Sequence, residues 1–297
     1  MPAGELDPDA RRQQRTSFGS VAAGYAAHRP GYPADAVTAL VGERPRRVLD
    51  LGAGTGLLTG VLLAAGHEVV AVDPAAPMLA ELRARHPQVV AHVGEAEAVP
   101  LPDGSVDAVV AGQAAHWFDP EPAAVEQRRV LRPGGTVGLV WNTRDEQVPW
   151  VAALGRVLAE VARGHATGED VVDAFARALG ARVEHHRSGI VQRVGPDQVV
   201  AGISTRSYVA TMDDARREEF LGEVRTVLDT HPDTRGRDLV DLPYRTDAYR
   251  LTPADAPPAR RDTRTPRGDP RSRTPPRQTP TSGRSRAGPC GYSGTSA

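Results

Sequence analysis

Short apolar runs alternate with longer amphipathic segments over the first half of the chain. The runs are nearly continuous in Val, Leu and Ala, which is typical of strands buried on both faces of a parallel sheet. The predicted strands are Val48–Leu51, Glu68–Val72, Val89–Val93, Val106–Ala111 and Thr136–Trp141, and the predicted helices between them are Leu57–Ala65, Ala75–Arg85 and Pro122–Leu131. This alternation, with right-handed crossovers, predicts a doubly wound, mostly parallel α/β sheet.

The second half of the pattern is more helical. Two helices, about Val148–Arg163 and about Asp170–Leu179, precede a strand near Arg182–Val194, and the last strand is expected at Leu239–Arg250. A further segment, about Gln198–Leu228, reads as helical and forms an insertion of about residues 196–230 before the last strand. The whole pattern predicts seven strands.

Apolar residues stop abruptly near the C-terminus. After Leu251 there is no Val, Ile, Leu, Met, Phe or Trp, and residues 253–297 contain nine Arg against three Asp, a net charge of +6. Such a segment buries too little apolar surface to offset its ordering entropy, so it is predicted to be disordered. We expect a flexible N-terminus at 1–14, one domain at 15–252 and a tail at 253–297, and a shifted reading frame after residue 252 is an open alternative.

Composition excludes several kinds of catalytic and metal site. All 36 basic residues counted as Lys or Arg are Arg, so neither a Schiff-base lysine nor a P-loop lysine is available. The single cysteine, Cys290, lies in the tail, which leaves no cysteine nucleophile or metal cluster in the body. The chain shows no apolar signal core and no run long enough to span a membrane, so a cytoplasmic protein is predicted.

The most informative motif follows the first predicted strand. Gly52, Gly54 and Gly56 form a turn between that strand and a helix, and Asp73 ends the next strand, 21 residues after Gly52. Glycines permit positive φ and close approach of a ligand, helix N–H groups face the site, and the carboxylate suits a ribose diol. A dinucleotide fingerprint would place its third glycine at position 57, where this chain has Leu57, so a nucleoside site is favoured over a pyrophosphate site.

Further motifs give the chain a family resemblance. It resembles the class I S-adenosylmethionine-dependent methyltransferases, and within them the small-molecule branch that includes trans-aconitate methyltransferase-like proteins. The resemblance covers about residues 15–252 and rests on ordered blocks at 48–56, 69–74, 94–110 and 129–140, on Phe18, Tyr25, Arg29, Pro30, Tyr32 and Pro33, on the run 115–119 and on the run 242–246. It implies S-adenosylmethionine as cofactor, a last strand that is antiparallel, and an insertion placed over the carboxyl ends of the sheet.

The resemblance also implies a set of cofactor-binding residues. Tyr25 and Arg29 are implied at the methionine carboxylate, Met78 at the adenine face, Glu95 and Ala96 at the adenine edge, and Gln113 near the methionine moiety. The expected cofactor site comprises Tyr25, Arg29, Gly52, Ala53, Gly54, Thr55, Gly56, Asp73, Pro74, Met78, Glu95, Ala96 and Gln113.

The residues that would bind the methyl acceptor are less clearly indicated by the sequence. His116 is the candidate catalytic residue, because a histidine titrates near neutrality and this one follows the fourth strand, although positioning of the acceptor is favoured over proton transfer. The candidate substrate pocket, suited to an anion, comprises Trp117, Trp141, Asn142, Arg144, Arg206, Tyr208 and Tyr244. His185 and His186 are adjacent on a strand and point to opposite faces, so no metal site is predicted.

Together these observations predict an enzyme that methylates a small molecule, at an oxygen such as a carboxylate, without a nucleic-acid or membrane partner. Carbon and nitrogen acceptors, an NAD-dependent oxidoreductase and a non-catalytic nucleoside-binding module are the alternatives. The sequence leaves the oligomeric state open.

Overall fold

A computed structural model describes residues 29–159, 168–206, 209 and 212–254. The chain divides into two units, Met1–Asp255 and Ala256–Ala297, and every described residue belongs to the first. The predicted flexible N-terminus, Tyr25, Tyr208 and nearly all of the predicted tail lie outside the described residues.

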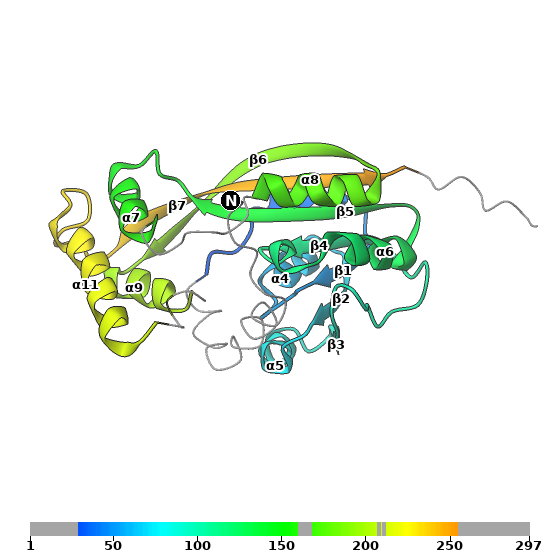
Figure 1. Cartoon of the computed structure of the whole chain (residues 1–297), viewed down its shortest axis with the longest axis horizontal. Coiled ribbons are helices and arrows are strands. Elements are labelled where there is room, and N and C mark those ends of the chain that lie inside the picture. Colours follow the sequence, from blue (N-terminus) through cyan, green and yellow to red (C-terminus); the bar gives the residue numbers. More distant parts are fainter. Residues whose placement is uncertain (1–28, 160–167, 207–208, 210–211, 255–297) are drawn as a thin grey trace, which may run out of the picture. The chain divides into compact units, whose positions relative to one another are not determined.

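Seven strands form one sheet in the order β3-β2-β1-β4-β5-β7-β6 (Figure 1). The strands are β1 Arg47–Leu51, β2 Glu68–Asp73, β3 Val90–Val93, β4 Val106–Gly112, β5 Leu131–Arg144, β6 Ala181–Val194 and β7 Val240–Pro253. Strands β1 to β5 are parallel to one another, whereas β7 runs antiparallel to both β5 and β6. The predicted doubly wound, mostly parallel sheet with an antiparallel last strand is confirmed.

Helices cover both faces of this sheet. The helices are α3 Ala34–Val41, α4 Leu57–Ala64, α5 Ala76–Arg85, α6 Pro120–Val130 and α8 Gly168–Leu179, with a short 3₁₀ turn at Ala115–Trp117. Side chains of α3 and α4 pack with Val48, and side chains of α6 and α8 pack with its neighbours Leu49 and Leu51. Because successive residues of a strand point to opposite faces, the apolar run of β1 supplies part of each core.

A separate core, called the second core below, lies beyond the carboxyl end of β5 and is distinct from the cores on the two faces of the main sheet. Strands β5, β6 and β7 are each 14 residues long, and their far portions support α7 Pro149–Ala159, α9 Pro196–Ser204 and α11 Asp214–Thr230. Trp150, Phe220 and Leu242 are among the buried residues of this core. Figure 1 shows these three helices gathered at one end of the long strands, the end at which β5 stops.

The structure refines two sequence-based boundaries. The segment Gln198–Leu228, predicted to be helical, comprises the helices α9 and α11 among the described residues. Asp213 begins the second helix, since its side chain accepts a 2.9 Å hydrogen bond from the Arg216 N–H, which is a normal N-cap arrangement. Strand β5 also continues past the expected end at Trp141, because β7 pairs with it as far as Arg144.

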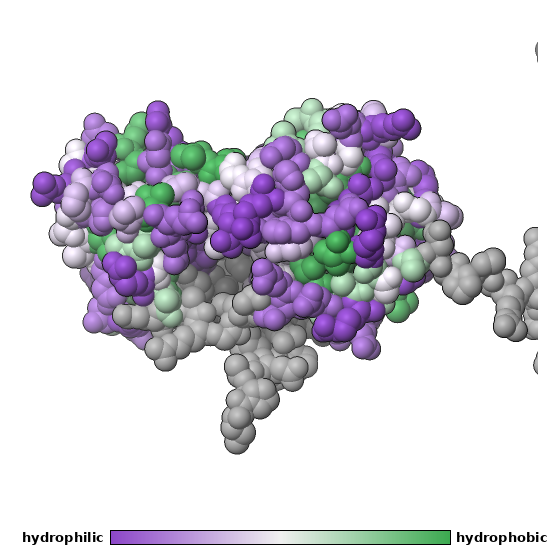
Figure 2. Space-filling model, turned by 90° about the horizontal axis from the view of Figure 1, so that it is seen from above, coloured by the Kyte–Doolittle hydropathy of each residue, from purple (hydrophilic) through white to green (hydrophobic). Residues whose placement is uncertain are grey.

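Hydrophilic side chains dominate the face of the molecule in Figure 2, and hydrophobic ones appear between them in patches. None of the helices in the described part of the chain is both long and apolar enough to cross a bilayer.

Candidate functional site

The glycine turn after β1 is fixed by backbone contacts to β2. The Val72 carbonyl accepts hydrogen bonds from the N–H groups of Gly52 and Ala53, at 2.8 and 3.2 Å. Gly52 has a φ of +71°, and a Cβ added there would lie 2.6 Å from the Cβ of Ala114. A side chain at Gly52 is therefore excluded twice, by backbone conformation and by the packing of the loop after β4.

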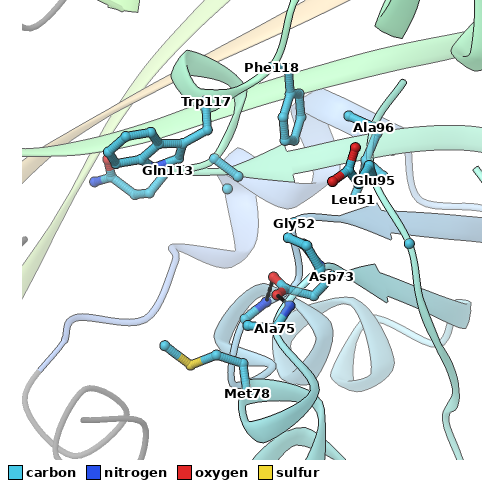
Figure 3. Close-up of a pocket in the computed structure, with 15 residues that line it drawn as sticks. Leu51, Gly52, Asp73, Ala75, Met78, Glu95, Ala96, Gln113, Trp117 and Phe118 are labelled. Carbon is cyan, nitrogen blue, oxygen red and sulfur yellow. Dashed lines mark hydrogen bonds between the residues drawn. The ribbon is translucent and has the colours of Figure 1, made fainter. Parts of the chain in front are cut away.

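Asp73 ties the same turn to the end of β2. Its Oδ2 accepts a 2.9 Å hydrogen bond from Gly54 N–H, and its Oδ1 accepts a 2.8 Å hydrogen bond from Ala75 N–H. The residue is 8% exposed, and Figure 3 shows both hydrogen bonds beside an open cavity. The carboxylate thus has a fixed orientation at the cavity wall.

The cavity beside Asp73, called the turn cavity below, brings together most of the predicted cofactor residues. Among its lining residues are the predicted Gly52, Gly54, Asp73, Pro74, Met78, Glu95, Ala96, Gln113 and Trp117. Ala53, Thr55 and Gly56 lie in the same turn but do not line the cavity. The cavity is also lined by residues that were not among the predicted ones, namely Leu51, Ala75, Gly94, Gly112, Ala114 and Phe118.

The signal for these additional residues is their position in the chain. Each is adjacent in sequence to a predicted residue. Five of them lie at the carboxyl end of β1, β2, β3 or β4 or within two residues after it, and Phe118 follows the 3₁₀ turn. The ends of parallel strands meet at one edge of the sheet, so whole strand ends line the cavity and not single residues.

Asp50 lies beneath the turn and is the next-to-last residue of β1. It is 1% exposed, and its Oδ2 accepts a 2.6 Å hydrogen bond from the Thr59 hydroxyl. Burial raises the pKa of Asp50 to about 7, against the lowering effect of the Thr59 hydrogen bond, and the nearby charge of Asp73 raises it further. A fixed negative charge at Asp73 therefore favours a neutral Asp50 below it.

Gln113 connects the turn cavity to β5. Its φ is +57°, the only positive value of a non-glycine residue in the described part of the chain. Its Nε2 donates a 2.7 Å hydrogen bond to the Asn142 carbonyl, and its backbone N–H donates to the Val140 carbonyl at 2.9 Å. The strained backbone is held by these two contacts, which aim the residue across the cavity mouth.

The side chain of Asn142 links three segments of the chain by hydrogen bonds and does not line the turn cavity. Its Nδ2 donates to the Gly31 carbonyl at 2.8 Å, and its Oδ1 accepts from the Thr246 hydroxyl at 2.6 Å. The chain that precedes α3 is thereby fastened across the end of β5 and onto β7.

A second cavity, called the arginine cavity below, lies near the end of β5, where Arg144 follows Asn142 by two residues. Arg29, Arg144 and Arg206 line it together with Tyr244, and its remaining lining residues are Leu154, Gln192, Val194, Gln198, Val199, Gly202, Ile203 and Leu242. Arg144 and Tyr244 are direct partners in the β5–β7 ladder, so their side chains project from the same face of the sheet. Of the predicted acceptor residues, Arg144, Arg206 and Tyr244 meet here, and Arg29 joins them.

The remaining predicted residues lie elsewhere. Trp141 packs edge-to-face on Tyr249, with ring centroids 6.1 Å apart, and lines neither cavity. His116 lies in the 3₁₀ turn with its ring 4.9 Å from that of Trp117, and Trp117 is the one of the two that lines the turn cavity.

The two adjacent histidines of β6 point to opposite faces. His185 lies 2.9 Å from Asp247 Oδ1 and stacks on Tyr249, whereas His186 lies 3.2 Å from Asp35 Oδ2 of α3. Within the described ranges, no cluster of three or more His, Cys, Asp or Glu side chains is arranged to hold a metal ion.

Comparison with known proteins identifies the family of the chain. The family model described as a methyltransferase domain matches residues 49–139. An uncharacterized methyltransferase of Mycobacterium tuberculosis (strain ATCC 25618 / H37Rv) is 44% identical over 243 residues, covering 82% of this chain and 98% of the relative. A malonyl-[acyl-carrier protein] O-methyltransferase of Methylococcus capsulatus is 41% identical over 159 residues, 46% of this chain and 54% of that protein.

A solved structure from Anaeromyxobacter dehalogenans, assigned to the type II methyltransferases, has a TM-score of 0.58 and 29% identity, and covers 76% of this chain and 97% of its own. The chain therefore belongs to the class I S-adenosylmethionine-dependent methyltransferases. It is an enzyme of that family, its cofactor is S-adenosylmethionine, and the predicted resemblance to the class I methyltransferases is confirmed.

Proposed function

We propose that the turn cavity binds S-adenosylmethionine, with Asp73 on the ribose hydroxyls. The fixed carboxylate of Asp73 supports this, because two backbone N–H groups orient it while it still lines the cavity. Gly54 supports it as well, since it lines the cavity and a Cβ there would meet no protein atom within 4 Å, which leaves room for a ligand. Met78, Glu95 and Ala96 are then the adenine side of the site, and Gln113 and Trp117 are the side nearer the reacting methyl group. Tyr25, at the methionine carboxylate, completes the proposal.

We propose further that the acceptor is a small molecule of the cytoplasm and that its methylated atom is a carboxylate oxygen. This proposal rests on one observation: a single cavity near Asn142 is lined by Arg29, Arg144 and Arg206. Guanidinium groups recognise carboxylates. The partial match to a malonyl-[acyl-carrier protein] O-methyltransferase also favours an oxygen acceptor.

Methyl transfer to a carboxylate requires little of the protein beyond alignment of the two reactants. Bound S-adenosylmethionine supplies a methyl group that its sulfonium already activates. The carboxylate oxygen forms a bond to the methyl carbon while the carbon–sulfur bond breaks and its electron pair remains on sulfur, which leaves S-adenosylhomocysteine and a methyl ester. No proton moves, so positioning of the two reactants is the main contribution of the enzyme. His116 then acts as a positioning residue through Trp117.

Incubation of the full chain with methyl-labelled S-adenosylmethionine and a panel of carboxylic acids, alcohols, amines and phenols tests this function. We expect label in a product that releases methanol on mild alkaline treatment, as a methyl ester does. The Asp73→Ala variant should lose most of this activity at limiting cofactor. Label that stays bound after alkaline treatment would place the methyl group on carbon, nitrogen or an ether oxygen and reject the carboxylate proposal.

A further inference from the structure

The side-chain amide of Asn142 is held in one orientation. The Gly31 carbonyl can only accept a hydrogen bond, so Nδ2 faces it at 2.8 Å, and Oδ1 accepts from the Thr246 hydroxyl at 2.6 Å. Thr246 is the direct partner of Asn142 in the β5–β7 ladder and is fully buried. A buried hydroxyl on β7 therefore holds the amide that binds Gly31.

Gln113 binds the backbone of Asn142 from the opposite edge of β5, since β5 lies between β4 and β7. The β4–β5 ladder reaches Gly112, opposite Val140, and the Gln113 N–H still donates to the Val140 carbonyl at 2.9 Å. The backbone of Gln113 then leaves the strand direction with a φ of +57°, and its Nε2 donates to the Asn142 carbonyl at 2.7 Å. The side chain thus replaces the backbone donor that a longer β4 would supply, so the position of Gln113 depends on Asn142.

The segment around Gly31 contacts the lining of both cavities. A Cβ on Gly112 would lie 2.6 Å from the Tyr32 hydroxyl oxygen, so Tyr32 packs directly on a residue that lines the turn cavity. Arg29, two residues before Gly31, lines the arginine cavity. The contact between Asn142 and Gly31 therefore fixes a segment that belongs to the walls of both cavities.

Asn142 thus connects the proposed donor site to the proposed acceptor site. Its carbonyl holds Gln113, which lines the turn cavity, and Arg144, two residues later on β5, lines the arginine cavity. Transfer of a methyl group needs the acceptor atom in line with the bond that breaks, and a misplacement of about 1 Å lowers the rate strongly. The hydrogen bonds of Asn142 are therefore suited to set the alignment of the two reactants.

We infer, on the basis of the proposed function, that Thr246 is a positioning residue for methyl transfer. Thr246 lines neither cavity. Acting through Asn142, it holds Gln113 and the segment around Gly31 at the spacing that in-line transfer requires. Because Asp73 and the glycine turn are held by other contacts, Thr246 contributes to the rate and not to the affinity for the methyl donor.

Substitutions in the full chain test this inference. Thr246→Val keeps the shape of the side chain and removes the donor to Asn142, whereas Thr246→Ser keeps a hydroxyl donor. Thr136→Val is the matched control, because Thr136 is also a buried threonine of the sheet, but its hydroxyl has no hydrogen-bond partner among the described residues. Asn142→Ala breaks the same link from a partly exposed position and keeps the test decisive if Thr246→Val folds poorly.

Three measurements are made on each protein. The values of kcat and KM are determined with the acceptor from the panel above that gives the highest rate. Affinity for S-adenosylhomocysteine is determined by calorimetry. Amide hydrogen exchange is followed by mass spectrometry in peptides covering residues 29–41 and 112–118, with residues 68–82, which include β2 and part of α5, as the internal reference.

We expect Thr246→Val and Asn142→Ala to lower kcat by about tenfold and to change the affinity for S-adenosylhomocysteine by less than about twofold. In a Gln113→Ala background, Thr246→Val should lower kcat by less than about twofold, since the effects of residues that act through one contact are not additive.

The exchange measurement reports the same link without any acceptor. In Thr246→Val, exchange should become faster at 29–41 and 112–118 and stay unchanged at 68–82, because only the contacts of one hydrogen-bonded junction are weakened. Thr246→Ser and Thr136→Val should match the wild-type protein in all three measurements.

The outcomes separate this inference from the proposed function. A kcat of Thr246→Val equal to that of Thr136→Val overturns the inference, and so does unchanged exchange at both segments. A fall in S-adenosylhomocysteine affinity as large as the fall in kcat also overturns it, since Thr246 would then support the donor site. A methylated product other than an ester, with the kcat effect intact, supports the inference and rejects carboxylate methylation. If no acceptor of the panel is methylated, the proposed function fails, and the exchange measurement alone decides the inference.

Discussion

The Thr59 hydroxyl donates a 2.6 Å hydrogen bond to Asp50 Oδ2 across the interface between α4 and β1. This contact lies directly below the glycine turn and gives a buried acid one hydrogen-bond donor. Burial nevertheless raises the pKa of Asp50 to about 7, from an ordinary 3.8, and the charge of Asp73 adds to that effect. The folded protein therefore holds a proton on Asp50 at pH values where the unfolded chain has released it.

Stability should depend on pH through Asp50. Because its folded pKa is raised, its contribution is most favourable below pH 4 and is lost as the pH rises toward 7. Asp50→Asn removes this titration, so the stability of the variant relative to wild type should rise between pH 5 and pH 8, by a few kcal/mol. Urea unfolding at both pH values measures the change. Asp107→Asn is the control, since the pKa of Asp107 is lowered by its contacts with Arg47 N–H and Arg132, and its relative stability should not change in this range. A pH-independent difference for Asp50→Asn contradicts the prediction.

Asp73 should affect both the fold and the cofactor site. Asp73→Ala removes the acceptor of two backbone N–H groups and should cost about 1–3 kcal/mol of stability. It should also weaken S-adenosylmethionine binding by roughly ten- to a hundredfold, measured by calorimetry below the melting temperature. Asp107→Ala is the matched control, because Asp107 also accepts a backbone hydrogen bond, from Arg47 N–H, but does so away from the turn cavity. Equal cofactor affinity in the two variants would show that Asp73 is only structural.

Gly54 and Gly66 form a second matched pair. Both have positive φ, +55° and +85°, and a Cβ at either position would meet no atom within 4 Å. Alanine should cost about 1 kcal/mol of stability at each, because left-handed backbone disfavours a side chain. Only Gly54→Ala should raise the dissociation constant of S-adenosylmethionine, by about tenfold or more, since Gly54 lines the turn cavity and Gly66 does not. Identical binding by both variants would mean that the cofactor does not approach the turn.

His116→Ala should lower kcat more than it lowers cofactor affinity. The His116 ring lies 4.9 Å from that of Trp117, and its loss removes this ring contact from a cavity-lining side chain. His116→Phe keeps a ring at this position and should retain most of the wild-type kcat, with an unchanged pH profile. A pH inflection in kcat that disappears in His116→Phe would instead identify His116 as a general base.

Much of the turn cavity is predictable from the sequence because the residue types that the glycine turn requires also line the cavity. The glycines after β1 and the acid ending β2 need particular residue types at one crossover spacing, and parallel strands bring their carboxyl ends together. Residues such as Ala114 and Phe118 carry no such chemical signature. They line the cavity because the loop after β4 packs on Gly52, which only the folded chain reveals.

The arginine cavity was only partly predictable for a different reason. Arg144 and Tyr244 are a hundred positions apart and become partners through the register of the β5–β7 ladder. Arg29 reaches the cavity because Asn142 binds the Gly31 carbonyl, a contact with no sequence pattern. In a chain so rich in arginine, residue type alone could not distinguish these three from solvated ones. Trp141 illustrates the converse, since an aromatic residue at a strand end packs on Tyr249 and α8 instead of lining a cavity.

The three 14-residue strands β5, β6 and β7 run without interruption from the main sheet into the second core. In the proposed function, the methyl donor is held at the ends of β1, β2 and β4, whereas the acceptor is held at the far ends of β5, β6 and β7. Exchanging α9 and α11 between relatives should therefore change the proposed acceptor cavity and leave the glycine turn untouched.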